Sequence, residues 1–197
     1  MSHRNAIVIG SGVVGLATAI ELLENRWNVQ IVAENISPNT TSDIPGAIWE
    51  PYLAGDANDP FFWRICKASW ERFDQLSKNE PHSYVFDING FNYFCNPSTK
   101  PAYLNLQNHR RAKKWELPKA YPYGWVHETK LIEIPFFIQY LETKFFMLGG
   151  TRQIKKVETV NSLLDENDQT RHKCDMIVVC SGLGKTTIWR IWSNCIF

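Results

Sequence analysis

The chain has 197 residues, and its 21 Lys and Arg nearly balance its 20 Asp and Glu, for a formal net charge of +1 at pH 7. Hydrophobic residues make up 44% of the sequence, enough apolar surface to offset the entropy lost on folding, so the composition excludes a disordered protein. The near-zero charge provides no general attraction to nucleic acid or to acidic lipid. We therefore expect a folded protein that binds neither nucleic acid nor a membrane.

The cysteines and histidines show no pattern typical of a metal site. The five cysteines are scattered and form no Cys-x-x-Cys pair, and the five histidines form no His-Glu-x-x-His motif. An odd number of scattered cysteines also argues against a secreted disulfide framework. We predict no metal ligands, and reduced thiols as in an intracellular protein.

The beginning of the chain predicts a β-α-β unit. Residues 5–9 form a short apolar run that ends at Gly10, which is typical of a strand buried on both faces. Residues 13–25 have apolar side chains at helical spacing, and residues 28–33 are again apolar and β-branched. This order of strand, helix and strand predicts a parallel sheet.

The middle of the chain predicts one helix and one hairpin. Residues 60–78 place apolar side chains along one stripe of a helix. Residues 84–94 alternate around Asn89-Gly90, a dipeptide typical of a two-residue hairpin turn. Residues 96–123 contain several prolines and no regular period, so we expect a loop there.

The last third of the chain predicts a helix and two strands. Residues 135–148 have helical spacing, and the glycine pair Gly149-Gly150 is typical of a helix C-terminus. The segments that follow predict a strand, a charged turn and a buried strand, over residues 153–160, 164–173 and 174–180.

A complete Gly-x-Gly-x-x-Gly motif lies between the first predicted strand and the first predicted helix. It consists of Gly10, Ser11, Gly12, Val13, Val14 and Gly15. The first glycine of such a motif permits a tight turn, the second lets the backbone approach a pyrophosphate, and the third allows helix and strand to pack closely. The unpaired amides at the helix start then bind the phosphates. The motif predicts a dinucleotide site.

An acidic residue at the end of the second predicted strand extends this site. Glu34 follows the glycine motif at close to the spacing of about 20 residues at which an acid binds a ribose hydroxyl. Asn35 comes next and is included in the predicted site, and Asp43 is the alternative acid. An acid here favours an unphosphorylated ribose, which fits both FAD and NAD.

The stretch from residue 39 to residue 52 distinguishes these two cofactors. It reads NTTSDIPGAIWEPY and closely resembles the T-T-S/T-D-x-A-x-G-x-W-x-P-Y stretch of the D-amino-acid oxidase and D-aspartate oxidase family, whose members depend on FAD. Tyr123-Gly124-Trp125 resembles a second block of that family, and residues 178–184 resemble a third, in its D-aspartate oxidase version. The resemblance covers roughly residues 4–184.

The resemblance implies an FAD site built from several segments. It makes Thr40, Thr41 and Ser42 donors to the phosphates or the ribityl chain, and Gly46, Ala47 and Ile48 backbone contacts of the flavin ring. It places Val157 beside the adenine, and Ser181 and Gly182 in a second cofactor loop. The alternative for residues 40–43 is an ordinary turn or helix cap, where Thr and Ser are common.

The predicted fold class is α/β, with a Rossmann-like FAD-binding domain and part of an antiparallel substrate domain. We expect the FAD-binding domain to comprise residues 1–55 and 130–184, and the partial substrate domain residues 80–129. Residues 185–197 match nothing expected from the family and form a non-homologous tail. The family's second half supplies the arginine that pairs with the substrate carboxylate, so we expect a truncated form of doubtful activity and name no catalytic residue.

The function implied by the resemblance is the oxidation of D-amino acids to 2-oxo acids, ammonia and hydrogen peroxide, with FAD as the cofactor. Two alternatives are a non-catalytic dinucleotide-binding fragment and an NAD-dependent dehydrogenase. Full-length family members are peroxisomal, but Cys195-Ile196-Phe197 is not a peroxisomal tripeptide, so we expect a cytoplasmic protein. The preference between acidic and neutral substrates and the oligomeric state stay open.

Overall fold

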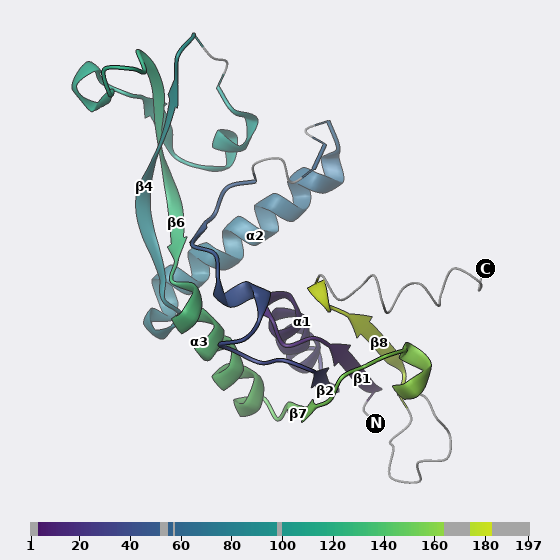
Figure 1. The fold of residues 1–197 in the computed structure, drawn as a ribbon. Coiled ribbons are helices and arrows are strands. Elements are labelled where there is room, and N and C mark those ends of the chain that lie inside the picture. The colour runs from purple at the N-terminus through teal and green to yellow at the C-terminus, as the bar shows by residue number, and fades with distance from the viewer. Residues whose placement is uncertain (1–3, 52–54, 57, 98–99, 164–173, 183–197) are drawn as a thin grey trace. The chain divides into compact units, whose positions relative to one another are not determined.

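The computed structural model describes residues 4–51, 55–56, 58–97, 100–163 and 174–182. The predicted turn at residues 164–173 and the predicted tail at 185–197 lie outside them. The chain divides into two units, Met1–Pro45 with Ile134–Phe197 and Gly46–Glu133, and each has its own sheet (Figure 1). The domain boundaries expected from the sequence remain predictions.

The first unit contains a parallel sheet. Its strands lie in the order β7, β2, β1 and β8, over Thr151–Ile154, Trp27–Ala33, Arg4–Ile9 and Met176–Val179. All three pairings between neighbouring strands are parallel. Helix α1 (Val13–Glu24) connects β1 to β2, which confirms the predicted β-α-β unit (Figure 1).

Apolar side chains cover both faces of this sheet. On one face, a buried apolar cluster consists of Ile9, Val32, Val157, Val160 and Leu163. Because successive strand residues point to opposite faces, the neighbouring Val8 and Ile31 lie on the other face, and neither has any exposed surface. Helix α1 packs on β2, and α3 (Ile134–Met147) packs on α1. The continuous apolar strands in the sequence reflect burial on two sides.

The strand expected over residues 153–160 is shorter than predicted. Strand β7 ends at Ile154 because its partner β2 ends at Ala33, and these two residues form the last pair. Beyond this point the chain turns inward, and residues 160–163 form a short 3₁₀ helix. The apolar residues that suggested a longer strand fill the cluster beneath the sheet instead.

The helix predicted over residues 135–148 is confirmed as α3. It ends at the glycine pair, where Gly149 has φ +90°. The amides of Gly149 and Gly150 donate to the carbonyls of Phe146 and Phe145, both at 3.0 Å. A left-handed residue of this kind satisfies carbonyls that the helix itself leaves unpaired.

The second unit contains an antiparallel sheet and one long helix. Strands β4 (Val85–Phe94) and β6 (Tyr123–Ile132) pair along their whole length, from Val85 opposite Ile132 to Phe94 opposite Tyr123. Two short strands, β3 (Ala47–Ile48) and β5 (His109–Arg111), also pair with β6. Helix α2 (Pro60–Asn79) begins after Asp59, whose side chain accepts a hydrogen bond from the Phe61 amide at 2.8 Å.

The hairpin predicted at Asn89-Gly90 is wrong. Both residues lie inside the continuous strand β4, and Gly90 faces His127 on β6. A Cβ on Gly90 would lie 2.6 Å from His127 Cε1, so the glycine serves a close approach between strands and not a turn. The sequence also predicts no strand at β6, because buried polar residues interrupt its apolar pattern. The loop expected over residues 96–123 contains β5 and two short 3₁₀ helices.

No helix within the described ranges combines the length and the hydropathy that a membrane crossing requires.

Candidate cofactor-binding site

The glycine turn lies at the carboxyl edge of the parallel sheet, where ligands of such sheets usually bind. Gly10 follows β1 with φ +114°, a conformation that L side chains rarely adopt. Its amide donates to the Val32 carbonyl at 2.9 Å. A Cβ on Gly10 would overlap the carbonyl of Cys180, the residue that follows β8. The glycine therefore lets β1 and β8 end side by side at this edge.

The start of α1 is open to an anion. Gly12 is the N-cap and has no side chain to cap the helix, and the first turn contains no acidic residue. The positive end of the helix dipole is therefore not compensated from within the helix. A Cβ on Gly12 would lie 2.8 Å from Ser42 Oγ. This combination of free backbone and positive potential is what a pyrophosphate requires.

Residues 40–43 form a cap of their own and also reach the glycine turn. Thr40 donates to the Asp43 carboxylate from its amide and its hydroxyl, at 2.8 and 2.6 Å, as the turn interpretation predicts. Burial opposes ionisation of Asp43, but hydrogen bonds from Ser37 and Thr40 outweigh it and lower its pKa. Ser42 Oγ accepts a hydrogen bond from the Val13 amide at 3.1 Å. The structure thus brings Ser42 to the helix start, whereas Thr41 is exposed.

Glu34 and Asn35 are exposed directly after β2, at the same edge of the sheet. The amide of Lys155 donates to the carbonyl of Ala33 at 2.9 Å, so the segment after β7 runs beside Glu34. The carboxylate of Glu158, and to a lesser degree that of Glu34, raises the pKa of Lys156. Val157 is buried in the apolar cluster next to Val32. Glu34 and Val157 therefore lie on two segments that run side by side after β2 and β7, and their contacts with the ribose and the adenine stay predictions.

The loop after β8 supplies a buried polar atom that finds no partner within the described part of the chain. Cys180 continues the sheet by donating from its amide to Ile9 O at 2.8 Å. The next residue, Ser181, has a buried hydroxyl oxygen with no hydrogen-bond partner among the described residues. Leaving such a group unpaired costs about 1–3 kcal/mol, so a bound ligand would stabilise it. Gly182 follows with φ +56°.

The remaining predicted site residues belong to the second unit. Ala47 and Ile48 form β3 and pair with Ile132 and Leu131 of β6. Gly46 has open space where a Cβ would lie. Their contact with a flavin ring stays a prediction.

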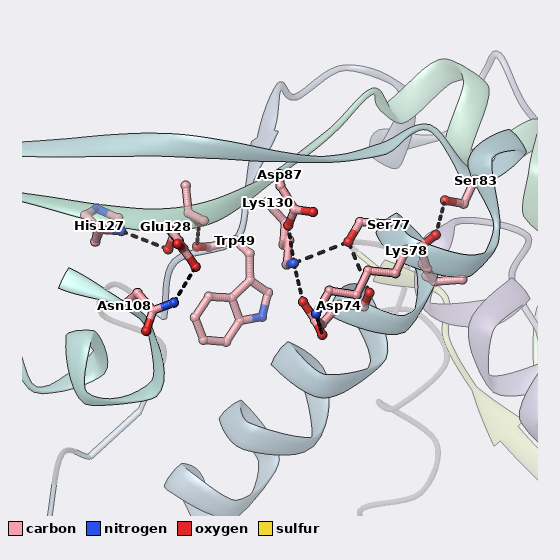
Figure 2. Close-up of polar contacts among 12 residues, drawn as sticks. Trp49, Asp74, Ser77, Lys78, Ser83, Asp87, Asn108, His127, Glu128 and Lys130 are labelled. Carbon is pink, nitrogen blue, oxygen red and sulfur yellow. Dashed lines mark hydrogen bonds and ion pairs between the residues drawn. The ribbon is translucent and has the colours of Figure 1, made fainter.

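A buried lysine in the second unit was not predicted from the sequence. Lys130 on β6 has a side chain that is only 2% exposed, and its ammonium pairs with Asp74 at 2.7 Å and with Asp87 (Figure 2). It also donates to Ser77 Oγ at 3.3 Å and lies 4.7 Å from the Trp70 ring centroid. The partners lie on α2 and β4, so no local pattern indicates the cluster.

A second polar group surrounds Glu50 on the same unit. Glu50 accepts hydrogen bonds from the hydroxyl of Tyr103 and from Asn92 Nδ2. His127 packs edge-on against the Tyr103 ring, and burial lowers the pKa of His127. Across the described ranges, no three His, Cys, Asp or Glu residues gather as a metal would require.

The chain is similar to curated amino-acid oxidases. It is 26% identical over 190 residues to a D-amino acid oxidase of Dugesia ryukyuensis, and the match covers 92% of this chain and 55% of that protein. It is 28% identical over 198 residues to the human D-aspartate oxidase, with 93% of this chain and 54% of that protein covered. The chain therefore spans about half the length of the curated relatives that it matches.

Solved structures share the fold at lower sequence identity. Glycine oxidase from Geobacillus kaustophilus matches with a TM-score of 0.64 and 14% identity, covering 96% of this chain and 58% of that one. An L-alpha-glycerophosphate oxidase from Mycoplasma pneumoniae, solved with FAD bound, matches with a TM-score of 0.56 and 14% identity, covering 78% of this chain and 45% of that one. These matches establish the architecture.

The family follows from a match along nearly the whole chain. The model described as DAO, FAD dependent oxidoreductase, matches residues 5–190. The glycine turn, the glycine N-cap of α1 and the Ser181 hydroxyl, which has no partner among the described residues, fit the pyrophosphate of a dinucleotide such as FAD. The chain belongs to the family of FAD-dependent oxidoreductases.

Proposed function

We propose that this chain forms the FAD-binding part of an oxidase that converts D-amino acids to 2-oxo acids, ammonia and hydrogen peroxide. The observation that carries the proposal is the start of α1, which has a glycine N-cap without a side chain and is faced by Ser42 at the carboxyl edge of the parallel sheet. The relatives named D-amino acid oxidase and D-aspartate oxidase support the substrate class. The substrate is thus a small D-amino acid.

The first unit supplies the groups that hold FAD. Backbone amides at the glycine turn and the start of α1 that have no partner within the protein bind the pyrophosphate, and the hydroxyls of Ser42 and Ser181 add donors beside them. Glu34 accepts a hydrogen bond from the ribose, and Val157 packs on the adenine side. When bound, FAD supplies the acceptor for the hydride that leaves the substrate α-carbon. The protein's contribution is to bind and orient both molecules.

A substrate carboxylate in a dry pocket needs a fixed cation, and a bidentate arginine is the efficient one. Arg110 is already paired with Glu116 through hydrogen bonds of 2.7 and 2.6 Å. The hydrogen bond from Arg110 lowers the pKa of Glu116 to about 2. The guanidinium of Arg111 lies 4.7 Å from the Trp125 ring centroid. Because Arg110 and Arg111 already have partners, a second candidate function is a protein that binds FAD without oxidising an amino acid.

One experiment separates the two candidates. The purified chain is desalted, its flavin absorbance is recorded, and D- and L-enantiomers of aspartate, glutamate, alanine and proline are added. Bleaching of the flavin without oxygen and peroxide release in air, with D-enantiomers alone, would support the oxidase. Bound flavin that neither enantiomer bleaches would support the second candidate. A chain that retains no FAD but binds NAD would overturn both.

A further inference from the structure

Arg152 is a mostly buried arginine that lies next to the glycine turn. It is on the edge strand β7, opposite Ile31 of β2, and its side chain is 15% exposed. The guanidinium forms an ion pair with Glu142 of α3 and lies 5.1 Å from the Phe146 ring centroid. Its Nη1 atom is 3.5 Å from the hydroxyl oxygen of Ser11, the second residue of the glycine motif.

The position of Arg152 in the sheet would suit an apolar side chain. Its neighbours across the sheet, Ile31 on β2 and Val8 on β1, have no exposed surface. Burying an ion pair at such a place rarely adds stability compared with apolar residues of similar volume. Fold stability therefore gives little reason for a charged residue at this position. The contact with Ser11 suggests that the charge serves the glycine turn instead.

The contact, which is long at 3.5 Å, favours one direction of the Ser11 hydroxyl. A guanidinium can only donate hydrogen bonds, so Ser11 Oγ accepts from Arg152 and its own proton points elsewhere. Ser11 is only 2% exposed, so few other groups compete for it. Arg152 also places a positive charge at the turn, whereas Glu142 pairs with it from α3 and offsets part of that charge. An anion bound at the turn is attracted by Arg152 and repelled by Glu142.

We propose that Arg152 is a positioning residue for the pyrophosphate of FAD, and that Glu142 limits how much of its charge reaches the phosphates. The inference rests on the proposed function, because it concerns the same cofactor site. It assigns the two members of one ion pair opposite effects on cofactor affinity. A pair that only stabilises the fold would give both members the same effect.

The test measures the dissociation constant of FAD for matched variants of the full chain, by quenching of flavin fluorescence. Arg152→Met keeps the length of the stem and removes the charge, and it should weaken FAD roughly tenfold or more, as for a lost bond to a charged group. Glu142→Gln should bind FAD more tightly than the parent, by roughly threefold or more. Arg152→Lys retains the charge and should recover most of the affinity.

Salt dependence and thermal unfolding distinguish charge from fold. The affinity of Arg152→Met should depend less on ionic strength than that of the parent, because one attractive charge is gone. Arg110→Met, which breaks the ion pair with Glu116 in the second unit, is the matched control and should leave FAD affinity unchanged. Unfolding midpoints without FAD show whether each variant folds. If Arg152→Met does not fold, the FAD affinities of Glu142→Gln and Arg152→Lys still test the inference.

Two results would overturn the inference, and they are distinguishable. Weaker FAD binding in both Arg152→Met and Glu142→Gln would show that the pair is a structural bridge, with the proposed function intact. A parent chain that binds no FAD would overturn the proposed function and this inference together.

Discussion

Gly12 and Ser42 define how closely a phosphate can approach the start of α1. The hydroxyl of Ser42 bonds the Val13 amide at 3.1 Å, and it lies where a side chain on Gly12 would have to go. The same small volume must admit the pyrophosphate. A single methyl or isopropyl group at Gly12 therefore competes with both the hydroxyl and the ligand.

We expect Gly12→Val to abolish FAD binding. The valine Cβ would meet Ser42 Oγ at 2.8 Å, and its branches would cover the amides that bind the phosphates. Flavin absorbance after desalting is the measurement. Gly12→Ala should show a smaller loss, because a serine hydroxyl can rotate away from one methyl group. Equal flavin content in Gly12→Val and the parent would contradict the assignment of the turn.

We expect Glu34→Ala to weaken FAD by about 1.5–3 kcal/mol, the range for a hydrogen bond to a charged group. Glu34 lies directly after β2, where the ribose of a dinucleotide is expected. Titration of the apoprotein with FAD gives the affinity. Glu158→Ala is the matched control, because Glu158 also interacts with Lys156 but is not predicted to bind ribose. Equal losses in both variants would mean that the ribose acid lies elsewhere, with Asp43 as the next candidate.

At the scale of elements, one ion-pair cluster links three parts of the second unit. Lys130 of β6 holds Asp74 of α2 and Asp87 of β4. The hydrogen bond from Lys130, and then that from Lys78, lowers the pKa of Asp74. The side chains of Asp74 and Asp87 are 31% and 59% exposed, so water can partly replace the lysine. The cluster therefore links α2 to the antiparallel sheet, and we expect its contribution to the free energy of unfolding to be moderate.

We expect Lys130→Met to lower the free energy of unfolding by roughly 2 kcal/mol, less than the 3–5 kcal/mol for a fully buried pair. Urea unfolding followed by tryptophan fluorescence measures this, because Trp70 packs against the Lys130 ammonium. Lys67→Met is the matched control, since it breaks an exposed pair with Glu71 on the same helix. A loss in the control as large as that in Lys130→Met would contradict the role of the cluster.

The same variant should change how stability depends on pH. Because the pKa of Asp74 is lowered on folding, the unfolded chain binds more protons than the folded one in acid. Its contribution is complete above an unfolded pKa of about 3.9 and is lost as pH falls through the lower folded pKa. We expect the parent to lose more stability than Lys130→Met between pH 5 and pH 2, a range set by roughly these values. Parallel curves for the two proteins would assign the acid sensitivity to other carboxylates.

At the scale of the whole molecule, the chain spans about half the length of its curated relatives. The first unit contains the elements that a dinucleotide site needs, from the glycine turn to the loop after β8. Arg110 and Arg152, which could neutralise a substrate carboxylate, are engaged by Glu116 and Glu142. Cofactor binding and substrate oxidation are therefore separate expectations for this chain.

We expect the 197-residue chain to oxidise D-amino acids slowly, at least about a hundredfold below the typical enzyme rate of about 10 per second. An unpaired buried carboxylate costs several kcal/mol, and each ~1.4 kcal/mol is tenfold in rate. Peroxide release with D-aspartate and D-alanine is the measurement, and Gly12→Val is the control for adventitious flavin. Turnover at an ordinary enzyme rate would show that the chain supplies the cation that the substrate carboxylate needs.

The sequence alone was enough for features that depend on neighbouring residues. The β-α-β unit, the glycine turn and the end of α3 were predicted, because helical spacing, strand burial and the backbone freedom of glycine act within a few residues. The self-capped turn at residues 40–43 was among the predicted alternatives for the same reason. Family resemblance then added FAD, which the spacing of the acid could not separate from NAD.

Only the tertiary structure decided features that join distant segments. Asn89-Gly90 matches a hairpin turn locally, but ten residues of β4 pair with β6 without interruption, and the glycine makes room for His127. Lys130 is buried because carboxylates on two other elements surround it. Arg152 reaches Ser11 across 141 residues of sequence. The energy of such contacts depends on where other parts of the chain lie, which no local pattern of residues specifies.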